Sequence, residues 1–195
     1  MEKISFMSQT IDDFSSFFRK SKEKEHFDAL QNINEAIRLI KAQLEASNIQ
    51  IIIDEKKLID RNIYGFANEF RQVLLNLIHN AMDAIIESQI DKGCITIIMK
   101  NENDDLVIQV CDNGAGIDEA HMDKIFDPYF TTKRKGSGIG LYMSKLIIEY
   151  HMDGLFGAKN TPTGACFTIR IKQGYNWWVT FMRSLEPKAS WLPMM

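Results

Sequence analysis

A polar stripe runs along a segment of the chain with helical periodicity. Its members recur at steps of three and four, at Glu69, Gln72, Asn76, Asn80, Asp83 and Glu87. The stripe could be an ordinary solvated face, but asparagine is a poor helix former, and Glu or Lys would fill such a face better. Two asparagines one turn apart would instead hold carbonyl oxygens in a fixed direction. Mg²⁺ binds oxygen ligands together with substrate phosphates, so the stripe is also a candidate cation site.

A carboxylate and two glycines directly follow an alternating strand. The segment reads Asp112-Asn113-Gly114-Ala115-Gly116-Ile117. Turn-forming residues of this kind can simply make a loop. However, Asp112 ends a strand that looks buried, where an unpaired carboxylate is costly. Because glycines let the backbone approach a flat ligand, the pattern also suits an adenine whose amino group donates to the carboxylate.

A third candidate segment joins basic residues to a glycine-rich turn that opens a predicted helix. Residues 133–135 are Lys-Arg-Lys, and the turn that follows reads Gly136-Ser137-Gly138-Ile139-Gly140-Leu141. Successive backbone N–H groups in such a turn can bind an anion, and the helix N-terminus adds a positive partial charge. Physically this is a phosphate site, although a glycine loop alone could be only a flexible hinge. No strand directly precedes it, so it matches neither a P-loop nor a Rossmann fingerprint.

The elements that must position these segments follow from hydrophobic periodicity and turn residues. Helices are predicted over residues 27–47, 67–89 and 140–151, and strands over 49–53, 94–100, 106–111, 154–159 and 165–171. The helices cluster early and the strands pair locally. The chain is therefore predicted to be α+β, with helices on one face of a mostly antiparallel sheet.

The two ends of the chain differ from this central region. Residues 1–20 predict a further helix with an apolar stripe at Ile4, Met7, Ile11, Phe14 and Phe18. That stripe must pack on the domain's own core or on a partner helix. Residues 173–195 contain all three tryptophans without a clean period, and no role can be assigned to them.

Length and composition exclude several classes of protein. The 195 residues favour one domain, and 45% hydrophobic with 25% charged residues is typical of a globular chain. A net charge of −3 gives no basic surface for nucleic acid. No apolar run approaches the roughly 18 residues that span a bilayer, and the N-terminus lacks the apolar part of a signal peptide. We therefore expect no contact of this segment with nucleic acid or membrane.

The three cysteines are Cys94, Cys111 and Cys166, and none has the spacing of a zinc ligand set. Cys111 and Cys166 lie within apolar alternations. They are predicted to be buried free thiols in a reducing cytosol.

The three polar segments, in this order, resemble the sequence boxes of the ATP-binding catalytic domain of sensor histidine kinases, in the superfamily that includes gyrase and the MutL mismatch-repair proteins. The N box resembles Asn76–Ala84, and the first glycine box resembles Asp112–Ile117. The F box resembles Ile125–Lys133, and the second glycine box resembles Gly136–Leu141. The resemblance covers residues 25–172, which it implies form the catalytic domain.

The resemblance also implies a fold and a set of site residues. The fold is the Bergerat (GHKL) ATP-binding fold, a two-layer α/β sandwich of three helices on a mixed, mostly antiparallel sheet, preceded by an N-terminal helix. Asn80 would hold Mg²⁺ against the phosphates with Asn76 in support, and Asp112 would bind the adenine amino group. The implied ATP-binding set is Asn76, Asn80, Asp83, Asp112, Gly114, Gly116, Ile117, Thr132, Lys133, Gly136, Ser137, Gly138, Ile139, Gly140 and Leu141.

By the same resemblance, the chain is the catalytic part of a two-component kinase that uses ATP and Mg²⁺. Such a transferase passes a phosphoryl group to a histidine on a dimerisation domain of a homodimer, and then to a response regulator. Residues 1–24 resemble the end of the dimerisation hairpin, and the expected location is the cytoplasm, with a parent that could be membrane-anchored. The chain departs from the family because none of His26, His79, His121 and His151 has the setting of a phosphoacceptor. The kinase is therefore expected to be incomplete without an acceptor helix.

Other functions remain open. In the ATP-hydrolysing relatives, a Glu stands four residues before the metal-binding Asn, and here that position is Asn76, which cannot act as a base. This favours phosphoryl transfer over hydrolysis. A protein serine kinase with the same boxes is disfavoured by the aromatic stripe in residues 14–18. A nucleotide-binding regulatory module without transfer activity stays possible because the acceptor is missing.

Overall fold

The computed structural model of the chain describes residues 23–55, 58–133 and 136–173. Their largest element is a five-stranded sheet in the order β2-β4-β5-β7-β6. The strands are β2 (Ile49–Asp54), β4 (Gly93–Glu102), β5 (Asp105–Asp112), β6 (Leu155–Asn160) and β7 (Ala165–Lys172). β2 pairs with β4 in parallel and the other neighbours are antiparallel, so the sheet is mixed.

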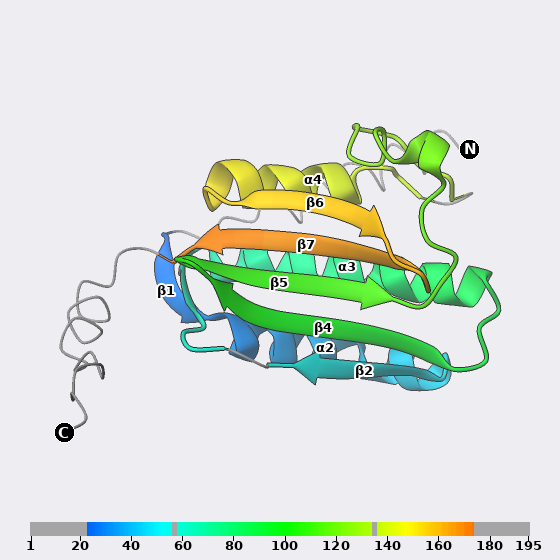
Figure 1. Cartoon of the computed structure of the whole chain (residues 1–195), viewed down its shortest axis with the longest axis horizontal. Helices are drawn as coiled ribbons and strands as arrows, with labels where there is room; N and C mark the ends of the chain where they lie inside the picture. The colour runs from blue at the N-terminus through cyan, green and yellow to red at the C-terminus, as the bar shows by residue number, and fades with distance from the viewer. Residues whose placement is uncertain (1–22, 56–57, 134–135, 174–195) are drawn as a thin grey trace, which may run out of the picture.

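Three helices form the second layer, behind the sheet in Figure 1. They are α2 (Ala29–Ala46), α3 (Ala67–Glu87) and α4 (Gly140–Leu146). α4 continues into a π-helical turn, η2 (Ile147–His151), and a short 3₁₀ turn, η1 (Glu119–His121), lies in the loop before it. A two-stranded sheet of β1 (Glu25–Asp28) and β3 (Asn62–Gly65) lies beside the start of α2.

The core lies between the two layers because each element has one apolar face. Alternate residues of β4 (Ile95, Ile97 and Met99) are fully buried, as are Leu106 and Ile108 of β5. This period of two points one side of each strand toward the helices. The period of α3 is that of a helix, and its buried side chains are Phe70, Val73, Leu74, Leu77, Ile78, Ala81, Met82 and Ile85. Burial of this helix face fixes the direction of the polar stripe on its flank.

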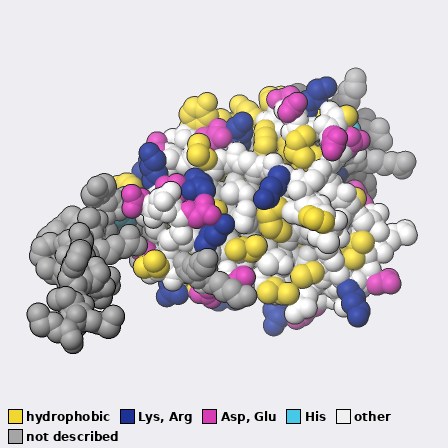
Figure 2. Space-filling model, viewed as in Figure 1, with side chains coloured by type: hydrophobic (Ala, Val, Ile, Leu, Met, Phe, Trp, Pro, Cys, Tyr) yellow, Lys and Arg dark blue, Asp and Glu magenta, His cyan; other side chains and the backbone are white. Residues whose placement is uncertain are grey.

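The other face of the sheet has no helix over it in the described part of the chain (Figure 1). Figure 2 shows basic, acidic and apolar side chains interspersed on this open face. Hydrogen bonds between neighbouring strands, such as Gln109 Nε2 to Thr168 Oγ1 at 3.2 Å, cross it. At one end Arg170 forms ion pairs with Glu102 and with Asp105.

The prediction that Cys111 and Cys166 are free thiols is wrong, because the structure joins them in a disulfide. The reason is the register of β5 and β7, in which Cys111 lies directly opposite Cys166. Local alternation along each strand could not reveal which residues face each other across two strands 55 residues apart. Cys94 is the free cysteine of the described residues.

The predicted fold class is confirmed, with three helices on a mixed sheet of five strands. The short strands β1 and β3 were not predicted, and the last predicted helix is divided between α4 and η2. The helix predicted in residues 1–20 lies outside the described residues. So does nearly all of the tryptophan-containing segment, except Gln173, whose side chain donates to the carbonyl of Asp60 at 2.8 Å.

Candidate functional site

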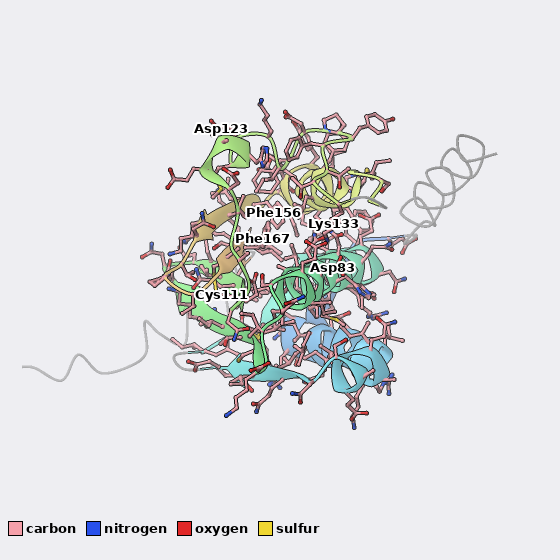
Figure 3. The ribbon with its side chains drawn as sticks, turned by 90° about the vertical axis from the view of Figure 1, so that its right-hand side faces the viewer. Asp83, Cys111, Asp123, Lys133, Phe156 and Phe167 are labelled. Atoms are coloured by element: carbon pink, nitrogen blue, oxygen red, sulfur yellow. A yellow bond between two sulfur atoms is a disulfide. The ribbon has the colours of Figure 1, made fainter. Side chains whose placement is uncertain are left out.

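The polar stripe of α3 is half-buried along most of its length. Gln72, Asn76, Asn80 and Asp83 have intermediate exposure, and only Glu87 at the helix end is exposed. The stripe lies on the flank of α3 next to the loop that joins β5 to α4 (Figure 3). Asn76, Asn80 and Asp83 each contact another segment of the chain, so the middle of the stripe is not an ordinary solvated face.

One lysine of the loop reaches two members of the stripe. Lys133 Nζ donates to Asn80 Oδ1 at 2.9 Å and to Asp83 Oδ2 at 2.6 Å. Figure 3 shows Lys133 next to Asp83 of α3. The side chains of Lys133 and Asp83 are 31% and 48% exposed, so this ion pair is accessible to solvent. An amide oxygen and a carboxylate oxygen thus converge on one cation, which is the donor chemistry that suits Mg²⁺.

Asn76 is held by α4 rather than by the loop. Its Nδ2 donates to Ser144 Oγ at 2.9 Å, and that hydroxyl donates to the carbonyl of Gly140 at 2.9 Å. A Cβ on Gly140 would lie 2.3 Å from Asn76 Oδ1, so any other residue at the start of α4 would require the Asn76 side chain to shift. Ser144 is fully buried and was not predicted as a site residue. Its signal in the sequence is a small hydroxyl on the apolar side of the predicted helix.

Asp112 is a buried carboxylate, only 5% exposed, at the end of β5. Its Oδ1 accepts from the backbone N–H of Gly114 at 2.9 Å and of Ala165 at 3.3 Å. Burial raises the pKa of the carboxyl above its ordinary value, against the opposing effect of the Gly114 and Ala165 N–H groups. The N–H groups of Gly114 and Ala165 both bond Oδ1, and no hydrogen bond from another residue reaches Oδ2 within the described residues.

The glycines beside Asp112 serve close packing within the chain. A Cβ on Gly114 would lie 2.8 Å from the backbone carbon of Ala84, so this glycine lets the loop touch α3. Gly116 has φ +78°, a left-handed conformation that favours glycine, and lies against Asn160. Asn160 also holds Ile117 from both sides, with Oδ1 accepting its N–H at 2.8 Å and Nδ2 donating to its carbonyl at 2.7 Å. Asn160 was not predicted, because its role depends on β6 lying next to this loop.

The second glycine segment forms a compact turn before α4. A Cβ on Gly136 would lie 2.6 Å from Thr131 Oγ1, and Gly138, with φ +68°, packs against the backbone of Tyr129. Ile139 is buried and anchors the start of α4. Thr132 is exposed, while Ser137 and Leu141 are half-buried.

The predicted site residues therefore form two groups. Lys133, Asn80 and Asp83 are in contact, and Gly140 is in contact with Asn76, at the α3–α4 side. Asp112 and Gly114 form the other group, beside β7 and Ala84 of α3. No hydrogen bond or ion pair joins the two groups within the described ranges.

A separate groove of about 450 Å³ lies at the start of α2 and contains none of the predicted site residues. It is lined by Asp28, Leu30, Gln31, Asn34, Glu35, Arg38 and Arg61. Within residues 23–55, 58–133 and 136–173, no cluster of three or more His, Cys, Asp or Glu could hold a metal ion. In the same ranges, no helix has the length and apolar character to cross a membrane.

Comparison with known proteins gives consistent results. The family described as "Histidine kinase-, DNA gyrase B-, and HSP90-like ATPase" matches residues 65–174. The chain is 30% identical over 149 residues to Sporulation kinase B of Bacillus subtilis (strain 168), covering 76% of this chain and 34% of that protein. It is 35% identical over 138 residues to the sensor histidine kinase ZraS of Salmonella typhi, covering 70% of this chain and 29% of that protein. The chain thus spans about a third or less of the length of these relatives.

Solved structures resemble the described fold. The catalytic domain of histidine kinase ThkA superposes with a TM-score of 0.68 and 28% sequence identity, covering 77% of this chain and 96% of that chain. Histidine kinase ThkA in complex with the response regulator protein TrrA gives a TM-score of 0.69 and 25% identity, covering 88% of this chain and 48% of that chain.

Proposed function

The chain belongs to the histidine kinase-, DNA gyrase B- and HSP90-like ATPases and carries the ATP-binding catalytic domain of a sensor histidine kinase, and on that basis we propose that it binds Mg²⁺–ATP and transfers the γ-phosphoryl group to a histidine. That histidine lies on a dimerisation domain, from which the phosphoryl group passes to a response regulator. In the full-length kinase the dimerisation domain makes a homodimer. The proposal depends mainly on one observation, the convergence of Asn80, Asp83 and Lys133 beside the glycine-rich turn.

The adenine end of the site is assigned to Asp112. Its Oδ1 is occupied by two backbone N–H groups, which hold the carboxylate in one orientation. Oδ2 is then the acceptor for the amino group of adenine. Gly114, Gly116 and Ile117 shape the backbone around it, and Asn160 keeps Ile117 in place.

The phosphate end is assigned to α3 and the loop before α4. Asn80 would hold Mg²⁺, with Asp83 beside it, and the ion would neutralise charge on the phosphate oxygens. Lys133 and Thr132 would contact phosphate oxygens. The turn of Gly136, Ser137, Gly138, Ile139, Gly140 and Leu141 supplies backbone N–H groups, and Asn76 fixes the position of α4 through Ser144.

Two contacts favour transfer to a protein over hydrolysis. The position that would carry a water-activating Glu is Asn76, and its amide is used to bond Ser144. Glu69, two turns earlier on α3, is held by His151, with Oε2 and Nδ1 2.6 Å apart. Neither residue can serve as a general base next to Asn80.

The likeness to a kinase solved together with a response regulator supports such a protein as the partner. ATP and response regulators meet in the cytoplasm, so the proposed function places this domain there. Disulfides are rare in that compartment. The disulfide between Cys111 and Cys166 is an exception to this rule.

The test is to incubate the chain with γ-labelled ATP and Mg²⁺, with and without a separately supplied acceptor hairpin that contains the phosphoacceptor histidine. We expect an acid-labile label on the hairpin only when the chain, ATP and Mg²⁺ are all present, and little free phosphate. Asn80→Ala is the matched loss-of-function control. Steady release of phosphate without labelled hairpin would contradict transfer, and binding of ATP without any transfer would favour a regulatory module.

A further inference from the structure

We propose that the ammonium group of Lys133 occupies the cation position of the site in the nucleotide-free chain, and that a divalent cation binds only by displacing it. This inference rests on the proposed function, because it concerns the Mg²⁺ that accompanies ATP. It adds a second role for Lys133, distinct from contact with phosphate.

The contacts of Lys133 place its charge where a cation ligand set would hold one. Nζ lies 2.9 Å from Asn80 Oδ1 and 2.6 Å from Asp83 Oδ2. These two oxygens belong to residues three positions apart on α3, so the helix directs both to the same side. An amide oxygen and a carboxylate oxygen that share one ammonium can equally share one metal ion.

Hydrogen bonds within the loop hold Lys133 next to α3. The backbone N–H of Lys133 donates to Thr131 Oγ1 at 3.1 Å, and the carbonyl of Lys133 accepts from the N–H of Gly136 at 3.4 Å. Gly138 packs against the backbone of Tyr129, so the two ends of this turn lie in contact. The contact therefore joins two segments 50 residues apart and holds the loop against the helix.

Charge balance makes the entry of the metal depend on the nucleotide. With Lys133 in place the charge of Asp83 is already neutralised, so a metal ion alone gains little. A polyphosphate attracts the ammonium away and leaves Asn80 and Asp83 to the ion. Because exposed ion pairs are weak, this exchange is energetically accessible.

The test uses Mn²⁺ alone as a paramagnetic probe, without nucleotide, titrated by electron paramagnetic resonance. We expect Lys133→Met to bind Mn²⁺ about fivefold more tightly than the unmodified chain, the fold-change that corresponds to an exposed ion pair. Lys124→Met is the matched control, because Lys124 is an exposed lysine of the same loop and its loss changes net charge equally. It should leave Mn²⁺ affinity close to that of the unmodified chain.

A second variant locates the effect. Adding Asp83→Asn to Lys133→Met should remove the gain if the ion uses this carboxylate. Equal Mn²⁺ affinity of Lys133→Met and Lys124→Met, with circular dichroism showing both folded, would overturn the inference. The unmodified chain is titrated in parallel with Mg²⁺–ATP. Absence of Mg²⁺–ATP binding would contradict the proposed function, whereas equal Mn²⁺ affinities would contradict only the role of Lys133.

Discussion

Replacement of Asp112 by asparagine distinguishes two roles for this carboxylate. In the first it recognises the adenine base, and in the second it only stabilises the turn. The amide oxygen of the introduced asparagine can still accept from the N–H groups of Gly114 and Ala165, which now both bond Oδ1. The amide nitrogen then takes the place of Oδ2. The adenine amino group, a hydrogen-bond donor, would then face the amide N–H donors of the asparagine instead of the acceptor Oδ2.

The expected loss follows from this reversal. A buried hydrogen bond to a charged group contributes about 1.5–3 kcal/mol, which is on the order of 10- to 150-fold in affinity. We expect Asp112→Asn to weaken ATP binding by about this factor, and the preference for ATP over GTP to shrink. In the unmodified chain guanine presents a carbonyl to the carboxylate, so acceptor meets acceptor.

The stability of the ligand-free chain should respond differently. Burial raises the pKa of Asp112, so protonation of this carboxyl stabilises the folded chain relative to the unfolded chain. The stabilisation that this protonation gives is fully present below the ordinary pKa of 3.8 and is lost as pH rises through the folded pKa. Asparagine does not titrate, so it makes no pH-dependent contribution to the stability of the variant. Near neutral pH the variant should therefore melt at a temperature equal to or above that of the unmodified chain.

The assay is calorimetric titration with ATP and with GTP, combined with melting curves across pH. Asp118→Asn is the control, because Asp118 Oδ1 accepts the N–H of Ala120 at 2.9 Å in a similar turn, but on the surface. The reasoning would be refuted if Asp112→Asn kept its ATP affinity and its preference for ATP while its melting temperature fell. That outcome would make Asp112 a structural cap of the turn.

Three further predictions follow from the site and the sheet. Asn80→Ala should remove the Mg²⁺-dependent part of ATP binding, about 1–3 kcal/mol, so that titrations with and without Mg²⁺ coincide; a persistent Mg²⁺ effect would contradict the assignment. The chain alone should not label itself from ATP, because none of its four histidines has an acceptor setting; an acid-labile label mapped to one of them would contradict this. Mass spectrometry after alkylation should find Cys111 linked to Cys166, and free thiols at both positions would contradict the pairing. The Cys166→Ser variant should lose about 2–4 kcal/mol of stability, the typical contribution of a disulfide.

Much of the fold could be predicted because the long elements have clear periods. α3 shows a helical period over 21 residues, and buried residues alternate over most of the 10 residues of β4, so burial alone determines which face of each element is apolar. β1 and β3 have four residues each, too few for a period to be recognised, and they depend on pairing with each other. The division between α4 and η2 depends on how the helix end packs, which local sequence does not encode.

The site was predicted in its residue types more than in its contacts. Asn80, Asp83 and Lys133 were all named as candidates, but that a lysine 50 residues further along the chain would bond the α3 oxygens depends on the path of the loop. The glycines were expected to make room for a ligand. Gly114 and Gly140 instead make room for Ala84 and Asn76 of α3. Ser144 and Asn160 were missed because each acts on a residue of a different element.

The most direct test of the central claim is a two-dimensional NMR titration of the isotopically labelled chain with Mg²⁺–ATP. The account predicts that the largest shifts fall on residues 80–83, 112–117, 132–133 and 136–141, and that GTP produces much smaller ones. Shifts centred on the groove at the start of α2, or the absence of shifts at millimolar Mg²⁺–ATP, would contradict it.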